Sequence, residues 1–171
     1  PGESWPEVRA TVDQHYPQVR AALGWDEAFG VGLRVSAEAA SALIEPAVRD
    51  DLKDLLARHN LYVFTLNGFP YGPFHGTRVK EDVYLPDWRE RERVDYTCAL
   101  IDLMAAILPA DQGLYGSIST VPGAFKARVN CASDVTEMVL NMVECVAYAV
   151  EVERKTGVRV VIALEPEPCC Y

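Results

Sequence analysis

The sequence is short of basic residues, and this shortage limits the partners that the chain can bind. Lys and Arg together number 16 against 25 Asp and Glu, which gives a formal net charge of −9. Nucleic-acid backbones and anionic membranes require a basic protein surface, so we expect neither as a partner. A phosphodiesterase acting on nucleic acid is disfavoured for the same reason. The charge does not discriminate among small-molecule partners.

Several recognisable sequence patterns are also missing. No signal-peptide pattern and no apolar run of transmembrane length occur in these residues, so we expect no membrane insertion. There is no phosphate-binding glycine motif of the P-loop or dinucleotide type. The five cysteines follow no disulfide-framework spacing, which predicts reduced thiols and a cytoplasmic location. Cys98 and Cys145 lie on apolar helix stripes and are expected in the core.

What the chain does have is a regular alternation of helical and strand patterns. Half of its 171 residues are apolar, which predicts one domain with a large core over residues 1–171. Periodicity and capping patterns predict helices over residues 4–23 with a break or kink at Pro17, from about residue 37 with a restart at Pro46, and over 87–108 and 133–156. Apolar β-branched runs predict strands over residues 29–36, 61–67, 116–121 and 160–164. Strict alternation predicts an α/β fold with a parallel sheet and right-handed crossovers.

The two faces of the predicted strands favour a β/α barrel over an open doubly wound sheet, although both fit the alternation. In a barrel the outer face meets helices, while the lumen near the carboxyl ends of the strands is where sites form. One predicted face is large and apolar: Val31, Leu33 and Val35; Tyr62, Phe64 and Leu66; Val160, Ile162 and Leu164. The other becomes small or polar toward the carboxyl ends: Gly32, Arg34 and Ser36; Val63, Thr65 and Asn67; Ser117 and Ser119; Ala163 and Glu165.

A complete (β/α)8 barrel needs about 250 residues. We therefore expect this chain to supply roughly five of the eight βα units. Pro1 is not an initiator residue, and Tyr171 follows a strand without a covering helix. The expectation is a partial (β/α)8 TIM barrel, truncated at both ends.

Glu165 is the first candidate for chemistry, because it follows directly on a buried apolar strand. A carboxylate in that place is costly unless it is paired or binds a cation. Two interpretations are equally open: a ligand for a divalent metal, or an ion pair with a lumen residue such as Arg34. The face pattern places Arg34, Asn67, Ser119 and Glu165 around one site, with the first three as substrate-binding residues. Glu167 is ranked as a loop or outer-sphere acid.

The second candidate is the long segment after Asn67, since loops of this length are often lids or binding loops. Its aromatic residues Phe69, Tyr71, Phe74 and Tyr84 are predicted to close over a ligand and exclude water. His75 is predicted to act as an acid or base near neutral pH. The alternatives are that the aromatic residues only plug the barrel mouth or form a subunit contact, and that His75 is a structural hydrogen-bond donor.

A third candidate is the turn that follows the strand over residues 116–121. Ser119 and Thr120 could bind hydroxyls or a phosphate there, with Lys126 as the counter-charge. Ordinary turn chemistry around Pro122 and Gly123 explains the same residues and is the more economical interpretation.

Five stretches of the sequence together resemble a known family. They are NGFPYGPFH over residues 67–75, KEDVY over 80–84, PDWR over 86–89, STVPGAFK over 119–126 and LEPEPCC over 164–170. These stretches are similar to the EboE family of metabolite traffic proteins, which belongs to the xylose-isomerase-like TIM barrels. The resemblance covers nearly the whole chain.

The resemblance implies a (β/α)8 barrel with a divalent metal (Zn, Mn or Mg) at its carboxyl face. In the wider superfamily the metal is usually held by Glu, Asp, His and Glu from the last four strands, and Glu165 matches the first of these. The other three would lie beyond Tyr171. The resemblance also implies metal-dependent isomerisation of a small carbonyl or polyhydroxylated metabolite, or alternatively the non-catalytic binding and escort of a precursor metabolite for export. Expected partners are that metabolite, a second copy of the chain, or other proteins of the same gene cluster.

Overall fold

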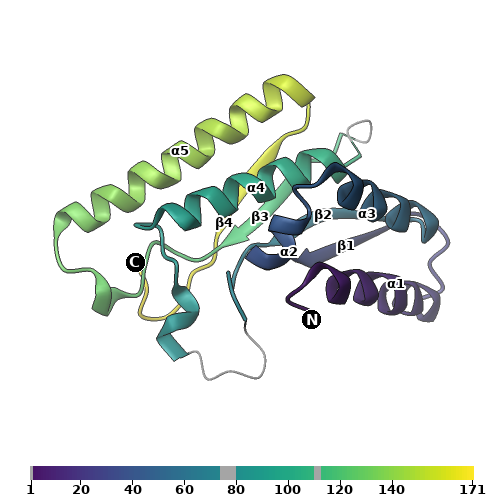
Figure 1. Cartoon of the computed structure of the whole chain (residues 1–171), viewed down its shortest axis with the longest axis horizontal. Coiled ribbons are helices and arrows are strands. Elements are labelled where there is room, and N and C mark those ends of the chain that lie inside the picture. Colours follow the sequence, from purple (N-terminus) through teal and green to yellow (C-terminus); the bar gives the residue numbers. More distant parts are fainter. Residues whose placement is uncertain (1, 74–79, 110–112) are drawn as a thin grey trace.

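The sheet at the centre of the molecule has four parallel strands in sequential order (Figure 1). The computed structural model describes residues 2–73, 80–109 and 113–171. The strands are β1 (Phe29–Arg34), β2 (Leu61–Asn67), β3 (Gly116–Thr120) and β4 (Val160–Leu164), hydrogen-bonded in the order β1-β2-β3-β4. The predicted α/β class and parallel sheet are confirmed. The described part of the chain holds four strands, so the expectation of roughly five βα units is too high by one strand.

Helices connect the strands and pack against one face of the sheet. They are α1 (Trp5–Ala22), α2 (Ala37–Ala42), α3 (Pro46–Arg58), α4 (Arg91–Ile107) and α5 (Ala132–Thr156), with short 3-10 turns η1 (Lys80–Tyr84) and η3 (Lys126–Arg128). Figure 1 shows α4 and α5 running side by side, and they contact each other along their length. Helices α1, α3 and α5 pack on the strand that follows each of them, while α4 packs on both β2 and β3.

One predicted helix start and one predicted break are wrong. The Ser4–Glu7 capping box is present, but α1 runs through Pro17 without interruption. The Asp87 backbone N–H donates to the Glu90 carboxylate, as the predicted capping box requires, yet α4 begins only at Arg91. In both cases local capping chemistry is real, and the packing of the neighbouring turn decides where the regular helix lies.

The predicted alternation fails along β2 because the strand contains a β-bulge. Val31 pairs with Val63 while the next residue, Gly32, pairs with Thr65, so Phe64 is an extra residue in the ladder. Val63 is fully buried toward the helices, whereas Phe64 is 42% exposed. Tyr62 and Phe64 therefore lie on the open face, opposite to the face predicted for them, because a bulge reverses the parity of the residues before it.

The core lies between the helices and the helix-facing side of the sheet. The strand residues that it buries are Val31, Leu33, Leu61, Val63, Leu66, Ile118 and Val160. The opposite face of the sheet is open. It carries an apolar hollow of about 570 Å3 lined by Tyr62, Phe64, Leu114, Tyr115, Ser117, Val161 and Ala163. Leu164, predicted on the buried face, is also half exposed.

Candidate functional site

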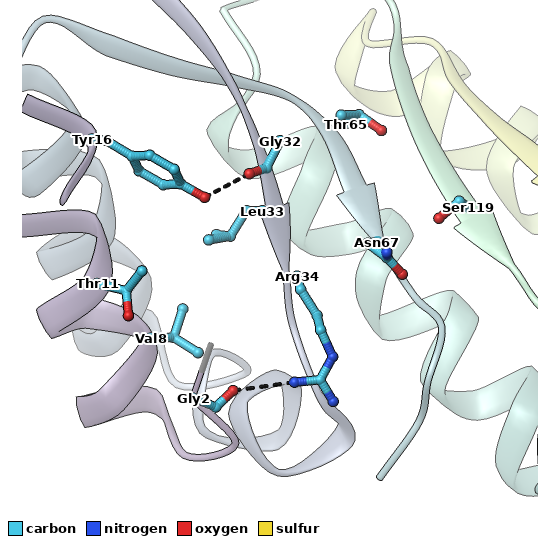
Figure 2. A pocket seen from close by; sticks show the side chains of 10 residues that line it. All are labelled: Gly2, Val8, Thr11, Tyr16, Gly32, Leu33, Arg34, Thr65, Asn67 and Ser119. Atoms are coloured by element: carbon cyan, nitrogen blue, oxygen red, sulfur yellow. Dashed lines mark hydrogen bonds between the residues drawn. The ribbon is translucent and has the colours of Figure 1, made fainter. Parts of the chain in front are cut away.

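A cavity of about 510 Å3 lies where the carboxyl halves of β1, β2 and β3 meet α1 (Figure 2). One wall comes from α1 and the residues before it, and the other from the open face of the sheet. The lining residues are Gly2, Val8, Thr11, Tyr16, Gly32, Leu33, Arg34, Thr65, Asn67 and Ser119. Three of the four residues predicted to surround a site are therefore in one cavity.

Strand register is what brings these three residues together. Arg34 pairs with Asn67 across β1 and β2, and Asn67 pairs with Ser119 across β2 and β3. Residues in one register row of adjacent strands project to the same side of the sheet. A guanidinium, a carboxamide and a hydroxyl consequently form a row across three strands.

Arg34 is held by several partners at the entrance to the cavity. Its two terminal nitrogens donate to the Glu3 carboxylate, each at 3.0 Å, and one of them also donates to the Gly72 carbonyl at 2.9 Å. The Gly2 carbonyl accepts a further bond at 3.3 Å. Arg34 thus joins the start of the chain, β1 and the loop after β2. Its carboxylate partner is Glu3, so the alternative that Arg34 pairs with Glu165 is wrong.

Asn67 and Ser119 offer hydrogen-bonding groups to the cavity. The Asn67 Oδ1 atom accepts from the Phe69 backbone N–H at 2.8 Å, which closes a turn at the end of β2. Within the described part of the chain, the Asn67 NH2 group and the Ser119 hydroxyl donate to no protein group. These donors are available to a ligand that carries oxygen atoms.

Tyr16 closes the opposite end of the cavity from α1. Its hydroxyl donates to the Gly32 carbonyl at 2.7 Å, and this bond is visible in Figure 2. Burial raises the pKa of Tyr16 above its ordinary value of 10.0. The group therefore stays protonated at neutral pH and acts as a donor.

Glu165 lies just beyond this row rather than in the cavity lining. Its backbone N–H donates to the Thr120 carbonyl at 3.0 Å, and its side chain is partly exposed. Ala163 is the β4 partner of Ser119, so Glu165 is two residues, roughly 7 Å, further along the strand direction. Among the described residues no group of three His, Cys, Asp or Glu side chains could hold a metal ion. The described residues therefore supply the partly exposed Glu165 carboxylate at this place, but not a complete set of metal ligands.

The described aromatic residues of the long loop contact other protein rings and do not line the cavity. Phe69 stacks on Tyr84, which in turn stacks on Phe125, with 5.8 Å between ring centroids in both pairs. Tyr71 meets Tyr96 edge to face at 5.0 Å. Phe74 and His75 lie outside the described residues, so their predicted roles stay predictions.

Arg93 is a residue of this region that the sequence patterns do not reveal. It is fully buried on α4, and its Nε and one terminal nitrogen donate to the Pro86 and Gly68 carbonyls, both at 2.9 Å. Its guanidinium also lies 5.7 and 5.6 Å from the ring centroids of Tyr71 and Tyr96. Burial lowers the pKa of Arg93 to about 10. By holding the Gly68 carbonyl, Arg93 positions the backbone next to Asn67.

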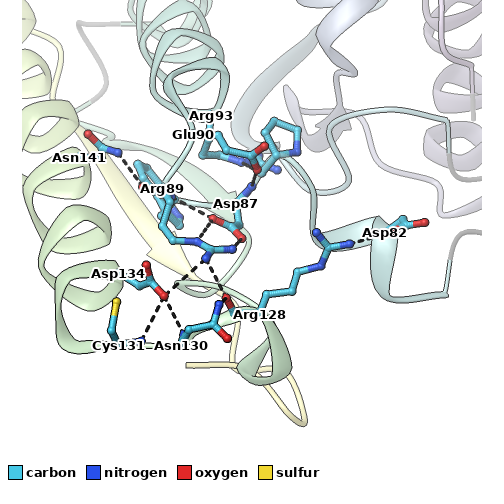
Figure 3. A network of polar contacts seen from close by, with 12 residues as sticks. Asp82, Asp87, Arg89, Glu90, Arg93, Arg128, Asn130, Cys131, Asp134 and Asn141 are labelled. Carbon is cyan, nitrogen blue, oxygen red and sulfur yellow. Dashed lines mark hydrogen bonds and ion pairs between the residues drawn. The ribbon is translucent and has the colours of Figure 1, made fainter.

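A polar network fixes the segment that precedes α4 (Figure 3). Asp87 is fully buried and binds Arg89 through both carboxylate oxygens, at 3.0 and 2.6 Å. Arg89 also donates to the Arg128 carbonyl at 2.8 Å and lies 3.7 Å from Asp134 at the start of α5. Trp88, which lies between Asp87 and Arg89 in the sequence, donates its indole N–H to the Val121 carbonyl at 2.9 Å. The PDWR stretch therefore clamps the loop after β3 to α5.

Comparison with known proteins yields no relative from which a function could be transferred. No family model matches the chain, and no curated protein or solved structure matches it either. Among the described residues, no helix has both the length and the apolar character needed to cross a membrane.

Proposed function

We propose that the four-stranded sheet is part of a xylose-isomerase-like (β/α)8 barrel, as the resemblance to the EboE family implies. The sequential order β1-β2-β3-β4 supports this proposal, since an open doubly wound sheet changes direction at a switch point. A helix layer on one face, with polar groups gathered at the carboxyl ends on the other face, is also typical of a barrel.

The cavity is proposed to bind a small polyhydroxylated or carbonyl metabolite. The single observation that carries this proposal is the row formed by Arg34, Asn67 and Ser119. Adjacent strands are roughly 4.8 Å apart, so a ligand of several carbons bearing oxygens reaches two or three of these groups. The Arg34–Glu3 pair leaves the cavity wall without net charge, which favours an uncharged ligand over an anion.

Ligand binding is tested with a panel of pentoses and hexoses and with the variants Asn67→Ala and Ser119→Ala. Loss of one hydrogen bond to a neutral ligand costs about 1 kcal/mol, so each variant should weaken binding roughly fivefold to tenfold. Thr11→Ala is the matched control, because its hydroxyl already donates to the Glu7 carbonyl at 3.1 Å. Unchanged affinity in both test variants would place the ligand elsewhere.

The reaction that we propose is isomerisation or epimerisation of that metabolite. A divalent ion supplies polarisation of a carbonyl or alkoxide when bound, and Glu165 would provide one oxygen ligand. His75 is the proposed acid or base that moves the proton.

Metal binding is tested by titrating the purified chain with Mn2+ and comparing Glu165→Gln with Glu167→Gln. The second variant removes a carboxylate from the same turn and serves as the matched control. If Glu165 is a ligand, its replacement should lower Mn2+ affinity about tenfold or more, while Glu167→Gln should stay near the parent value. Equal affinity in all three proteins would exclude the proposed ligand.

A second candidate function is non-catalytic binding and escort of a precursor metabolite. It is favoured by the cavity lining, which contains no Asp, Glu, His or Lys among the described residues. Incubating the chain with Mn2+ and the sugar panel in deuterium oxide separates the two functions. An isomerase or epimerase yields a second sugar, which carries deuterium at the reacting carbon if a proton is moved as proposed, whereas an escort protein returns the bound sugar unchanged.

A further inference from the structure

Two cysteine side chains face each other across the contact between α4 and α5. The Cys98 and Cys145 sulfurs are 4.0 Å apart, and both cysteines are free thiols. A disulfide bond needs a sulfur–sulfur distance of about 2.05 Å. The two sulfurs must therefore approach each other by about 2 Å for the bond to form.

The two thiols differ in accessibility. Cys145 is fully buried and its sulfur lies 3.8 Å from the Val94 carbonyl oxygen, to which it donates. Cys98 is partly exposed and lines a groove of about 280 Å3 between α2 and α4. Of the two residues, Cys98 is therefore the one open to a small reagent, while Cys145 is enclosed.

The pKa values of the two thiols also differ, in the direction that makes the more exposed thiol the more acidic one. The thiol–thiol hydrogen bond with Cys145 lowers the pKa of Cys98, and partial burial opposes this effect without reversing it. The same bond, together with burial, raises the pKa of Cys145. Since the thiolate is the nucleophilic form of cysteine, Cys98 is the more reactive of the two.

We propose that Cys98 is an oxidation site for hydrogen peroxide and that Cys145 is its resolving thiol. The Cys98 thiolate attacks one peroxide oxygen, the O–O bond breaks, and the departing hydroxide takes up a proton to form water. Cys98 becomes a sulfenic acid. The Cys145 sulfur then attacks the Cys98 sulfur, forming the S–S bond while the S–O bond breaks. The second hydroxide leaves with the Cys145 proton as water, so two thiols are oxidised and one peroxide is reduced to two waters.

The test treats the reduced chain with equimolar hydrogen peroxide, alkylates the remaining thiols and maps peptides by mass spectrometry. The expected product is a Cys98–Cys145 cross-link that dithiothreitol reverses. In Cys145→Ser, Cys98 should instead accumulate as a sulfenic acid that dimedone traps. Cys131 is exposed on the surface and has no cysteine partner in the described structure, so it provides the internal reference for a thiol that should form no intramolecular cross-link.

Cys131→Ser is the matched control variant, and its cross-link yield should equal that of the parent chain. Oxidation of Cys131 with Cys98 left as a thiol would overturn the proposal. Overoxidation of Cys98 to the same extent in the parent and in Cys145→Ser would overturn the resolving role. If Cys145→Ser fails to fold, the cross-link map of the parent chain decides alone, because absence of the Cys98–Cys145 peptide contradicts the proposal.

Discussion

Replacement of Arg93 by methionine tests how the loop after β2 is held. Methionine keeps much of the side-chain volume but removes every donor, so the Pro86 and Gly68 carbonyls lose buried partners. Each unsatisfied buried acceptor costs about 1–3 kcal/mol. The two lost ring contacts cost about 1 kcal/mol each, and relief of a buried charge offsets part of the total. We expect the free energy of unfolding to fall by about 2–4 kcal/mol.

Urea denaturation followed by tryptophan fluorescence and circular dichroism measures this change. Arg91→Met is the matched control, because Arg91 lies two positions away and makes exposed ion pairs with Asp95 and Glu144. Loss of such pairs costs less than about 1 kcal/mol. If Arg93→Met is as stable as Arg91→Met, desolvation of the buried cation outweighs its bonds, and the assignment of Arg93 as the residue that holds the loop fails.

Three further changes have defined outcomes. Gly68→Ala puts a methyl group 2.8 Å from a backbone oxygen of β3 and should cost about 1–3 kcal/mol of unfolding free energy, whereas Gly72→Ala meets no atom of the described residues within 4 Å and should cost little; equal urea midpoints would contradict this. Tyr84→Leu should lose about 1–3 kcal/mol by removing two stacking contacts, and Tyr84→Phe should retain them. Arg9 holds the pKa of Asp51 below its ordinary value of 3.8, so the folded chain binds that proton less tightly than the unfolded chain. Its stabilisation is complete above pH 3.8 and is lost as the pH falls through the lowered pKa, so Asp51→Asn should flatten the stability curve in acid.

The strand ends were the part of the site that sequence could predict. Apolar β-branched runs locate all four strands, and parallel strands end at one edge of a sheet. That reasoning is sufficient to bring Arg34, Asn67 and Ser119 together, because each follows the last apolar residues of its strand. It requires no knowledge of side-chain contacts.

The remaining features depend on contacts that a local pattern does not contain. The bulge at Phe64 arises from pairing with another strand, so the period of two within β2 gives no sign of it. Glu3 binds Arg34 across 31 positions of sequence, and neither residue's neighbours identify the other. Arg93 resembles an exposed helix arginine until the aromatic rings that cover it are known. Its place on the same stripe as Thr97 and Leu100 is the one local sign of burial.

The bond between Glu3 and Arg34 has a practical consequence for recombinant work. A version of the protein shortened to begin at Ser4, or one carrying an affinity tag that displaces the first residues, would expose an uncompensated guanidinium beside Asn67. Such a preparation would attract phosphate or citrate from its buffer and would bind acidic compounds more readily than a chain in which Glu3 neutralises Arg34. Ligand screens are therefore best run with Glu3 in place.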